Sequence, residues 1–258
     1  TYGEDPFLTA RLGVRFVKGL QGDDPKYLKA AACAKHYAVH SGPESLRHEF
    51  DVEVSKQDLF DTYLPAFEAL VKEAGVESVM GAYNRVYGQP ACANDTLTDI
   101  LRNQWGFKGH FVSDCGALSD FHLHHKVTDT APESAALAVQ HGCDLNCGAV
   151  YLHVLTAIQE GLLTEEDITP CVERLMATRM KLGMFDKDCP FDSIPYSIND
   201  CDAHRAVSLE AARRSQVLLK NDGLLPLDVN KLSSIAVIGP NADSQEVLKG
   251  NYNGTASQ

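Results

Sequence analysis

Short apolar runs of strand length alternate with longer amphipathic stretches over the first 184 residues of the chain. The apolar runs lie at residues 31–39, 76–83, 109–113 and, as a very short one, 143–147. Helical spacing of apolar residues predicts helices at 7–20, 55–74, 96–105, 132–140, 151–161 and 165–182. Strands that alternate with helices in this way are typical of parallel α/β units, in either a barrel or an open sheet. The pattern therefore predicts an α/β fold.

Polar side chains stand at the ends of the predicted strands. They are His36, Tyr83, Asp114 and Asp144. In a parallel barrel the C-terminal ends of all strands meet at one face, and the active site is assembled there. The pattern therefore favours a barrel with these four side chains at the same end.

Two details of the helices also follow from the spacing. The helix predicted at 7–20 places Leu8, Leu12, Phe16 and Leu20 on one face. Ser55 is predicted to cap the helix at 55–74, and Thr164 is predicted to cap the helix at 165–182; these are residue types that accept hydrogen bonds from the first free backbone N–H groups.

The chain changes character after residue 184. Residues 185–203 are rich in Asp, Pro, Ser and Asn without periodicity, which predicts a linker that crosses a surface. A helix at 204–218 and a β-branched strand at 234–239 follow. We therefore predict three parts: residues 1–184 as one α/β domain, 185–203 as a linker, and 204–258 as the incomplete beginning of a second domain.

Charge and composition restrict the classes of partner. The formal net charge of −12 argues against a nucleic-acid backbone or an anionic membrane surface, and no apolar run approaches membrane-spanning length. The eight cysteines are too widely spread for a disulfide-dense scaffold; free buried thiols and one or two bridges stay as alternatives. The histidine-rich segment 122–125 is interpreted as a solvated cluster in preference to a metal site. We predict no metal and no cofactor.

Asp114 is the most prominent candidate for chemistry. It ends the apolar run at 109–113, and small residues follow it directly. A carboxylate that a rigid strand delivers to the C-terminal edge of a parallel sheet is suited to act as a nucleophile. The alternative is that Asp114 caps the next helix.

Several short motifs together resemble glycoside hydrolase family 3 over essentially the whole chain. They are Thr-Tyr-Gly-Glu-Asp-Pro at 1–6, Ala-Lys-His-Tyr-Ala at 34–38, Met-Gly-Ala-Tyr-Asn-Arg at 80–85, Trp-Gly-Phe-Lys-Gly at 105–109, Val-Ser-Asp-Cys-Gly-Ala at 112–117, Leu-Leu-Lys-Asn at 218–221 and Leu-Leu-Pro-Leu at 224–227. The segment 113–117 and the later Gly-Asn-Tyr-Asn-Gly at 250–254 resemble the β-xylosidase/α-L-arabinofuranosidase branch of that family.

The resemblance implies a fold. It implies that the chain is a fragment holding part of a TIM-like (β/α)8 barrel without its first strands, followed by the start of an α/β sandwich. It also implies a secreted or periplasmic whole protein. The acid/base glutamate is then expected in the second domain, beyond Gln258.

The resemblance also implies site residues. Asp114 is the expected nucleophile, Lys35 and His36 are expected to bind hydroxyls of the sugar, and Tyr83 is expected close to the nucleophile. Met80 is expected to line the same subsite, with a place in the core as the alternative. Glu44 follows in a loop at the same face; it is a candidate for a sugar hydroxyl, against the alternative of an ion-paired surface carboxylate.

The function implied is that of an exo-acting retaining glycosidase acting on plant-wall oligosaccharides. It would release terminal β-D-xylose, with α-L-arabinose left open as a second sugar. Two alternatives stand beside it. One is a β-glucosidase of the same family, and the other is a sugar-binding fragment that lacks part of the catalytic machinery.

Overall fold

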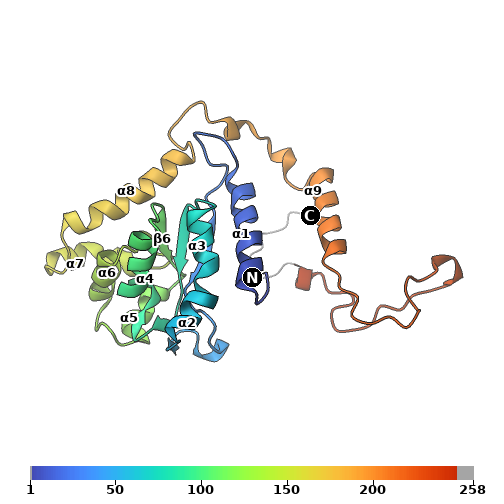
Figure 1. Cartoon of the computed structure of the whole chain (residues 1–258). Coiled ribbons are helices and arrows are strands. Elements are labelled where there is room, and N and C mark those ends of the chain that lie inside the picture. Colours follow the sequence, from blue (N-terminus) through green and yellow to red (C-terminus); the bar gives the residue numbers. More distant parts are fainter. Residues whose placement is uncertain (1, 249–258) are drawn as a thin grey trace. The chain divides into compact units, whose positions relative to one another are not determined.

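The computed structural model describes residues 2–248 (Figure 1). The chain divides into two compact units, Thr1–Ile194 and Pro195–Gln258. Each unit is described by itself below. The segment 250–254 and the end of the predicted second domain lie outside the described residues.

A parallel sheet forms the centre of the first unit. It consists of β1 (Cys33–Tyr37), β3 (Ser78–Gly81) and β6 (His110–Ser113), in the order β1-β3-β6. β3 and β6 pair in register from Ser78 opposite His110 to Gly81 opposite Ser113. The short strand predicted at 143–147 is reduced to a single parallel bridge between Leu145 and Val112 of β6. The three longer apolar runs are therefore strands, and their C-terminal ends share one edge.

The sheet is open within residues 2–248. Apart from the Leu145 bridge, no further strand joins either edge of the β1-β3-β6 sheet in that part of the chain. The α/β class predicted from the pattern is confirmed, whereas a closed barrel is not formed by the described residues. A second small sheet pairs β2 (Asp51–Val52) with β4 (Arg85–Val86) and β4 with β5 (Gln89–Pro90).

Helices surround the central sheet (Figure 1). Their bounds are α1 Pro6–Gln21, α2 Lys56–Asp58, α3 Pro65–Lys72, α4 Asp95–Asp99, α5 Ala117–Leu123, α6 Ala131–Gln140, α7 Val154–Gln159 and α8 Glu165–Lys181. The helix predicted at 55–74 is interrupted: a π-helical turn at Leu59–Tyr63 separates α2 from α3. Pro65 begins α3, and because proline has no N–H the regular hydrogen-bond ladder cannot continue through it. Both predicted caps are confirmed, since Ser55 accepts a hydrogen bond from the N–H of Asp58 and Thr164 forms a capping box.

The apolar face predicted for the first helix is not the face that packs. Ala10 and Val14 of α1 are buried against Ala69 of α3, whereas Leu8, Leu12 and Phe16 are exposed. α1 and α3 lie side by side because small side chains let the two backbones approach. α1 carries apolar residues on both faces, so spacing alone does not decide which face is buried.

Two buried carboxylates tie the sheet to the helices behind it. The Asp144 side chain has no exposed surface; it accepts a hydrogen bond from the N–H of Phe111 at 2.7 Å and pairs with Arg102 at 2.9 Å and Arg174 at 2.7 Å. Glu77 pairs with Lys181 of α8 at 2.8 Å. Asp144 therefore has a structural role. The prediction that it lies at the same end as Asp114 is wrong, because Asp144 precedes the Leu145 bridge and accepts the N–H of Phe111, a residue inside β6.

The second unit contains α9 (Asp202–Arg214). The predicted strand at 234–239 is wrong for the described residues: no strand is present there, and Ile235, Val237 and Ile238 are exposed. A β-branched run forms a strand only when a neighbouring strand accepts its hydrogen bonds, and the described part of this unit offers none. Two short 3₁₀ helices, Pro190–Ser193 and Tyr196–Ile198, lie in the segment predicted as a linker.

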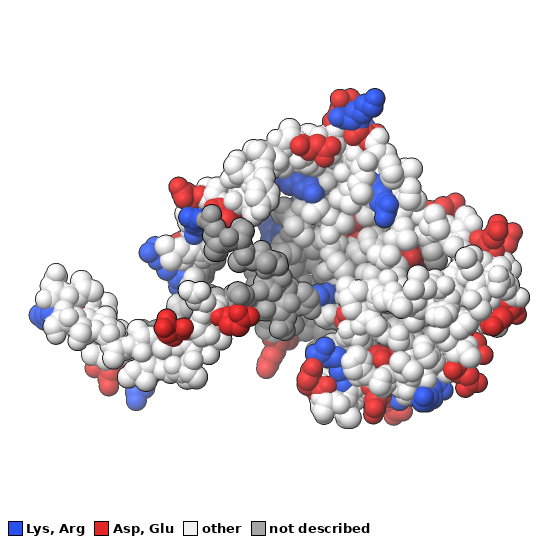
Figure 2. Space-filling model, turned by 180° about the vertical axis from the view of Figure 1, so that it is seen from behind, with Lys and Arg blue, Asp and Glu red and all other residues white. Residues whose placement is uncertain are grey.

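Two further observations concern the length of the described helices and the distribution of charge on the surface. No helix within residues 2–248 is long and apolar enough to cross a membrane. On the face shown in Figure 2, the acidic and basic side chains are interspersed, and the described residues form no broad basic patch there.

Candidate active site

The carboxylate of Asp114 stands directly after β6, at the edge where the three parallel strands end. Its Oδ1 accepts a hydrogen bond of 2.7 Å from the N–H of Cys115. The helix-cap alternative is wrong, because the N-cap of α5 is Gly116 and no side chain caps that helix. Gly116 has φ +83°, a left-handed conformation that glycine adopts without a steric cost, and it turns the chain from β6 into α5.

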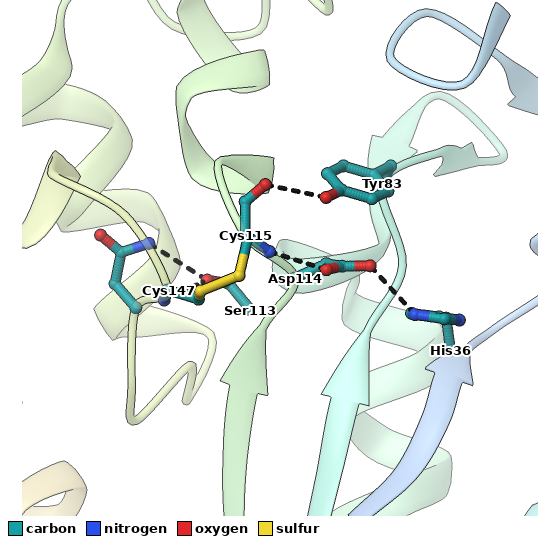
Figure 3. The surroundings of a disulfide bond; sticks show 7 residues. His36, Tyr83, Ser113, Asp114, Cys115 and Cys147 are labelled. Carbon is teal, nitrogen blue, oxygen red and sulfur yellow. Dashed lines mark hydrogen bonds and ion pairs between the residues drawn. A yellow bond between two sulfur atoms is a disulfide. The ribbon is translucent and has the colours of Figure 1, made fainter. Parts of the chain in front are cut away.

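His36 reaches the same carboxylate from β1 (Figure 3). Its Nε2 lies 3.1 Å from Oδ2 of Asp114. The side chains of His36 and Asp114 are 25% and 13% exposed, so the pair is shielded from most of the solvent. The Lys35–His36 peptide bond is cis.

Tyr83 approaches the nucleophile candidate from the loop after β3. Its hydroxyl donates a hydrogen bond of 2.8 Å to the carbonyl oxygen of Cys115 (Figure 3). Burial, followed by the negative charge of Asp114, raises the pKa of Tyr83 to about 12, so the hydroxyl keeps its proton at neutral pH. Met80 lies half-buried in β3, opposite Val112 of β6.

The surroundings of Asp114 favour its ionised form. Burial raises the pKa of this carboxyl, whereas the hydrogen bonds from His36 and from the N–H of Cys115 and the charge of a protonated His36 are among the contributions that lower it. The net result is a pKa of Asp114 below its ordinary value. An ionised, partly buried carboxylate held by two donors is suited to attack an electrophilic carbon.

Lys35 and Glu44 are the two exposed residues among the predicted site residues. Lys35 is exposed and lines an open cavity of about 610 Å³, together with His36, His40 and Ser41. This cavity extends between α1, β1 and α3, and Asp114 is not among its lining residues. Glu44 is mostly exposed and forms an ion pair with Arg47, which is the ion-paired alternative considered for this loop.

A histidine–aspartate pair beside Tyr83 was not expected from the sequence. The ring of His48 meets the ring of Tyr83 edge-on at 4.8 Å, and its Nδ1 lies 2.8 Å from Oδ2 of the buried Asp120. His40 lies 5.9 Å from the Tyr83 ring and pairs with Asn84 at 3.1 Å. The one feature of the sequence that could have pointed to His40 and His48 is their position, because they flank Glu44 in the loop after β1.

The cysteines give a second finding that the sequence left open. Cys115, the residue after Asp114, forms a disulfide bond with Cys147 across 32 residues of sequence (Figure 3). The other six cysteines are free thiols. The pairing joins the loop after β6 to the segment after Leu145, which lies beside β6.

The histidines of segment 122–125 do not converge on one point. The Nδ1 of His122 lies 2.9 Å from the hydroxyl of Ser134, whereas His124 faces Asp120 at 3.8 Å. His125 is buried, and neither of its ring nitrogens has a hydrogen-bond partner in the described part of the chain. Within residues 2–248 no group of three or more His, Cys, Asp or Glu side chains is arranged to hold a metal ion.

Comparison with known proteins assigns the family. The model of the glycosyl hydrolase family 3 N-terminal domain matches residues 1–178, and that of the C-terminal domain of the same family matches residues 216–258. The chain belongs to glycosyl hydrolase family 3. The resemblance drawn from the sequence motifs is therefore confirmed.

Similar proteins in this family are about three times as long as the chain. A protein named xylan 1,4-beta-xylosidase from Xylanibacter ruminicola is 46% identical over 99% of the chain and 30% of its own length. Beta-D-xylosidase 1 of Arabidopsis thaliana is 40% identical over 99% of the chain and 34% of its own length. The chain thus spans about a third of the length of these relatives.

Solved structures in the family share this fold. A GH3 exo-beta-xylosidase in complex with a xylobiose aziridine activity-based probe superimposes with a TM-score of 0.90 at 35% identity, over 99% of the chain and 34% of that structure. A beta-glucosidase from Listeria innocua in complex with glucose gives a TM-score of 0.77 at 33% identity, over 87% of the chain and 32% of that structure. The chain is therefore similar to both kinds of glycosidase.

Proposed function

We propose that the whole protein is an exo-acting retaining glycoside hydrolase that releases terminal β-D-xylose from plant-wall oligosaccharides. The observation that carries the proposal is the carboxylate of Asp114, which stands at the C-terminal edge of a parallel sheet with His36 at 3.1 Å and the N–H of Cys115 at 2.7 Å. Membership of the family and the names of the relatives support the reaction class.

In this proposal Asp114 is the nucleophile of a two-step reaction. An oxygen of Asp114 attacks the anomeric carbon, the glycosidic oxygen leaves with a proton from a general acid, and a covalent glycosyl-enzyme forms. The residue that acted as the general acid then removes a proton from water, which attacks the anomeric carbon and frees Asp114. The acid/base is expected to be a glutamate beyond Gln258, in the part that the longer relatives possess.

The neighbouring side chains take distinct roles. The donor from His36 keeps Asp114 ionised, while Lys35 and His36 are proposed to bind sugar hydroxyls with oriented N–H donors. Tyr83, protonated at neutral pH, is proposed to lie near the ring oxygen, where positive charge develops. Met80 is proposed to line the sugar subsite.

Glu44 is also proposed to reach a sugar hydroxyl. Its exposure allows it to reach a ligand, but it would first have to leave its partner Arg47. We therefore expect a Glu44→Gln variant to have a smaller effect on KM than a Lys35→Ala variant.

The same proposal includes the architecture of the whole protein. Residues 1–184 would be the C-terminal part of a (β/α)8 barrel, 185–203 the linker, and 204–258 the start of an α/β sandwich. The break between the compact units at Ile194 and Pro195, and the two family models that match on either side of it, support this division.

A β-glucosidase is the second candidate, because the superposition with beta-glucosidases supports a common sugar site. The relatives with the higher identities are named xylosidases, which favours xylose. A sugar-binding protein without turnover is a further outcome that the experiment must separate.

Nucleophile trapping on the whole protein tests the proposal. The protein is incubated with a 2-deoxy-2-fluoro xylosyl donor, digested, and mapped by mass spectrometry. We expect the label on the peptide that carries Asp114, with no label in an Asp114→Asn variant and normal labelling in the matched, exposed Asp129→Asn variant.

Other outcomes correct the proposal in different ways. A label on another residue would refute the role of Asp114. Labelling by the 2-fluoro glucosyl donor alone would move the function to β-glucosidase. Binding of xylose without label or turnover would leave the sugar-binding alternative.

A further inference from the structure

The loop that carries Asp114 is tied to the segment 145–148 at several points. The N–H of Ser113 donates to the carbonyl of Leu145 at 2.9 Å, and the N–H of Gly116 donates to the carbonyl of Cys147 at 2.7 Å. In the opposite direction, the N–H of Cys147 donates to the hydroxyl of Ser113 at 3.1 Å. The Cys115–Cys147 disulfide is the covalent member of this set (Figure 3).

Cys115 belongs both to the disulfide and to the surroundings of Asp114. Its N–H donates to Oδ1 of Asp114 at 2.7 Å, and its carbonyl oxygen accepts the hydroxyl of Tyr83 at 2.8 Å. The backbone of one residue therefore contacts both side chains, and its own side chain is bonded to Cys147. Rotation of the peptide on either side of Cys115 would break one of the two contacts.

Each cysteine of the disulfide is followed by a glycine, the residue type with the greatest backbone freedom. Gly116 follows Cys115 with φ +83°, and Gly148 follows Cys147 with φ +145°. Glycine gives up more conformational freedom than any other residue when it is held in one conformation. Cys115 itself is exposed, so packing does little to hold its side chain.

We propose that the Cys115–Cys147 disulfide is a positioning element for the nucleophile, and that it makes the glycosidase activity dependent on the oxidised state of the protein. It holds the N–H of Cys115 toward Asp114 and the carbonyl of Cys115 toward Tyr83. The inference rests on the proposed function of Asp114 and adds a regulatory property to the same site.

The chemistry of the switch is a thiol–disulfide exchange. A dithiol reductant supplies two electrons and two protons: the S–S bond breaks, Cys115 and Cys147 become thiols, and the dithiol closes into its own disulfide. Reduction frees the side chain of Cys115 and lets the peptide after Asp114 rotate. The donor to Oδ1 is then lost for part of the time, and with it one of the contacts that favour the ionised carboxylate.

The test compares three forms of the whole protein. They are the wild type, a Cys147→Ser variant that keeps the side chain of Cys115, and a Cys201→Ser variant as the matched control, in which a free cysteine outside the site is replaced. Each is assayed with 4-nitrophenyl β-D-xyloside before and after incubation with a dithiol, and the wild type again after reoxidation. Thermal unfolding is followed in parallel, so that loss of fold is recognised.

We expect kcat of the wild type to fall about tenfold or more on reduction and to return on reoxidation, because small displacements of a reacting group cost large factors in rate. KM should change little. The Cys147→Ser variant should match the reduced wild type and should not respond to the dithiol. The acid limb of its pH–rate profile should move to higher pH, which a merely structural disulfide would not produce. The Cys201→Ser variant should behave as wild type throughout.

The experiment distinguishes failure of the inference about the disulfide from failure of the proposed function. Wild-type turnover that is unaffected by reduction and by Cys147→Ser, with an unchanged acid limb, overturns the inference and leaves the proposed function intact. A change in KM alone also overturns it, since the disulfide would then act on binding. If the oxidised wild type turns over neither xylosides nor glucosides, the proposed function fails, and the inference fails with it.

Discussion

Removal of the imidazole at His36 should weaken catalysis mainly by changing the ionisation of Asp114. The Nε2 of His36 lies 3.1 Å from Oδ2 of the carboxylate, in a pair that is 25% and 13% exposed. In a His36→Ala variant this donor is lost, while the burial that raises the pKa of Asp114 stays. The pKa of Asp114 should therefore rise.

The size of the effect follows from the kind of bond that is removed. A hydrogen bond to a charged group contributes about 1.5–3 kcal/mol. That range corresponds to about 10-fold to 150-fold in an equilibrium or a rate. Because the pair retains some contact with solvent, the lower end applies: kcat/KM should fall roughly tenfold to thirtyfold at a pH below the wild-type pKa of Asp114, and by a smaller factor at pH 5.

The assay is the dependence of kcat/KM on pH with 4-nitrophenyl β-D-xyloside. This substrate has a good leaving group, so the rate depends little on the general acid and reports on the nucleophile. Asp114 must be ionised to attack; a higher pKa moves the acid limb to higher pH, and the loss should be largest at low pH. A His36→Gln variant, which can still offer a neutral N–H donor, should lie between wild type and His36→Ala. The remote, exposed His153→Ala variant should be unchanged.

One result would refute this reasoning. If His36→Ala lowers kcat/KM by the same factor at every pH and the acid limb stays in place, His36 does not control the charge of Asp114. Its role would then be contact with the sugar alone.

Three further predictions concern chemistry and stability. An Asp114→Gly variant should lose turnover and regain it when azide is added, because azide can attack the anomeric carbon from the side that Asp114 has left. The expected product is the α-xylosyl azide, identified by NMR; formation of the β-azide would contradict the role of Asp114 as the nucleophile. Asp144→Asn should lower the free energy of unfolding by about 3–5 kcal/mol in urea titrations, since Arg102 would keep a buried charge with no full partner. The folded-state pKa of His125 is lowered by burial to about 4, below the ordinary 6.5, so protonation favours the unfolded state. The stabilisation that comes from keeping His125 neutral is complete above about pH 6.5 and is lost as the pH falls toward about 4. The free energy of unfolding should be lower by about 2–3 kcal/mol at pH 4.5 for this reason. A His125→Phe variant should lack that part of the acid sensitivity.

Local sequence was sufficient for the elements and for the position of the main candidate. Apolar runs of strand length predicted β1, β3 and β6, and capping residues predicted the starts of α2 and α8. Several short motifs together gave the resemblance to the family, which the family models confirmed. These features depend on residues close together in the chain, so a pattern along the chain records them.

Local sequence failed where packing between distant segments decides the outcome. Apolar residues occur on both faces of α1, and only the small side chains that meet α3 determine which face is buried. A run with strand composition at 234–239 forms no strand among the described residues, because a strand is completed by its neighbour.

The details of the site were decided in the same way by the tertiary structure. The sequence pattern predicts Asp114 and Asp144 at the same ends of the strands, and the structure places only Asp114 there. Two arginines from other helices bury and neutralise Asp144, whereas Asp114 faces His36 and stays partly open. The pairing of Cys115 with Cys147 depends on the Leu145 bridge that brings the two segments together beside β6. The sequence by itself therefore determined which residue types end each strand, and only the tertiary structure decided which of these carboxylates is left available for chemistry, because charge and burial depend on groups contributed by distant parts of the chain.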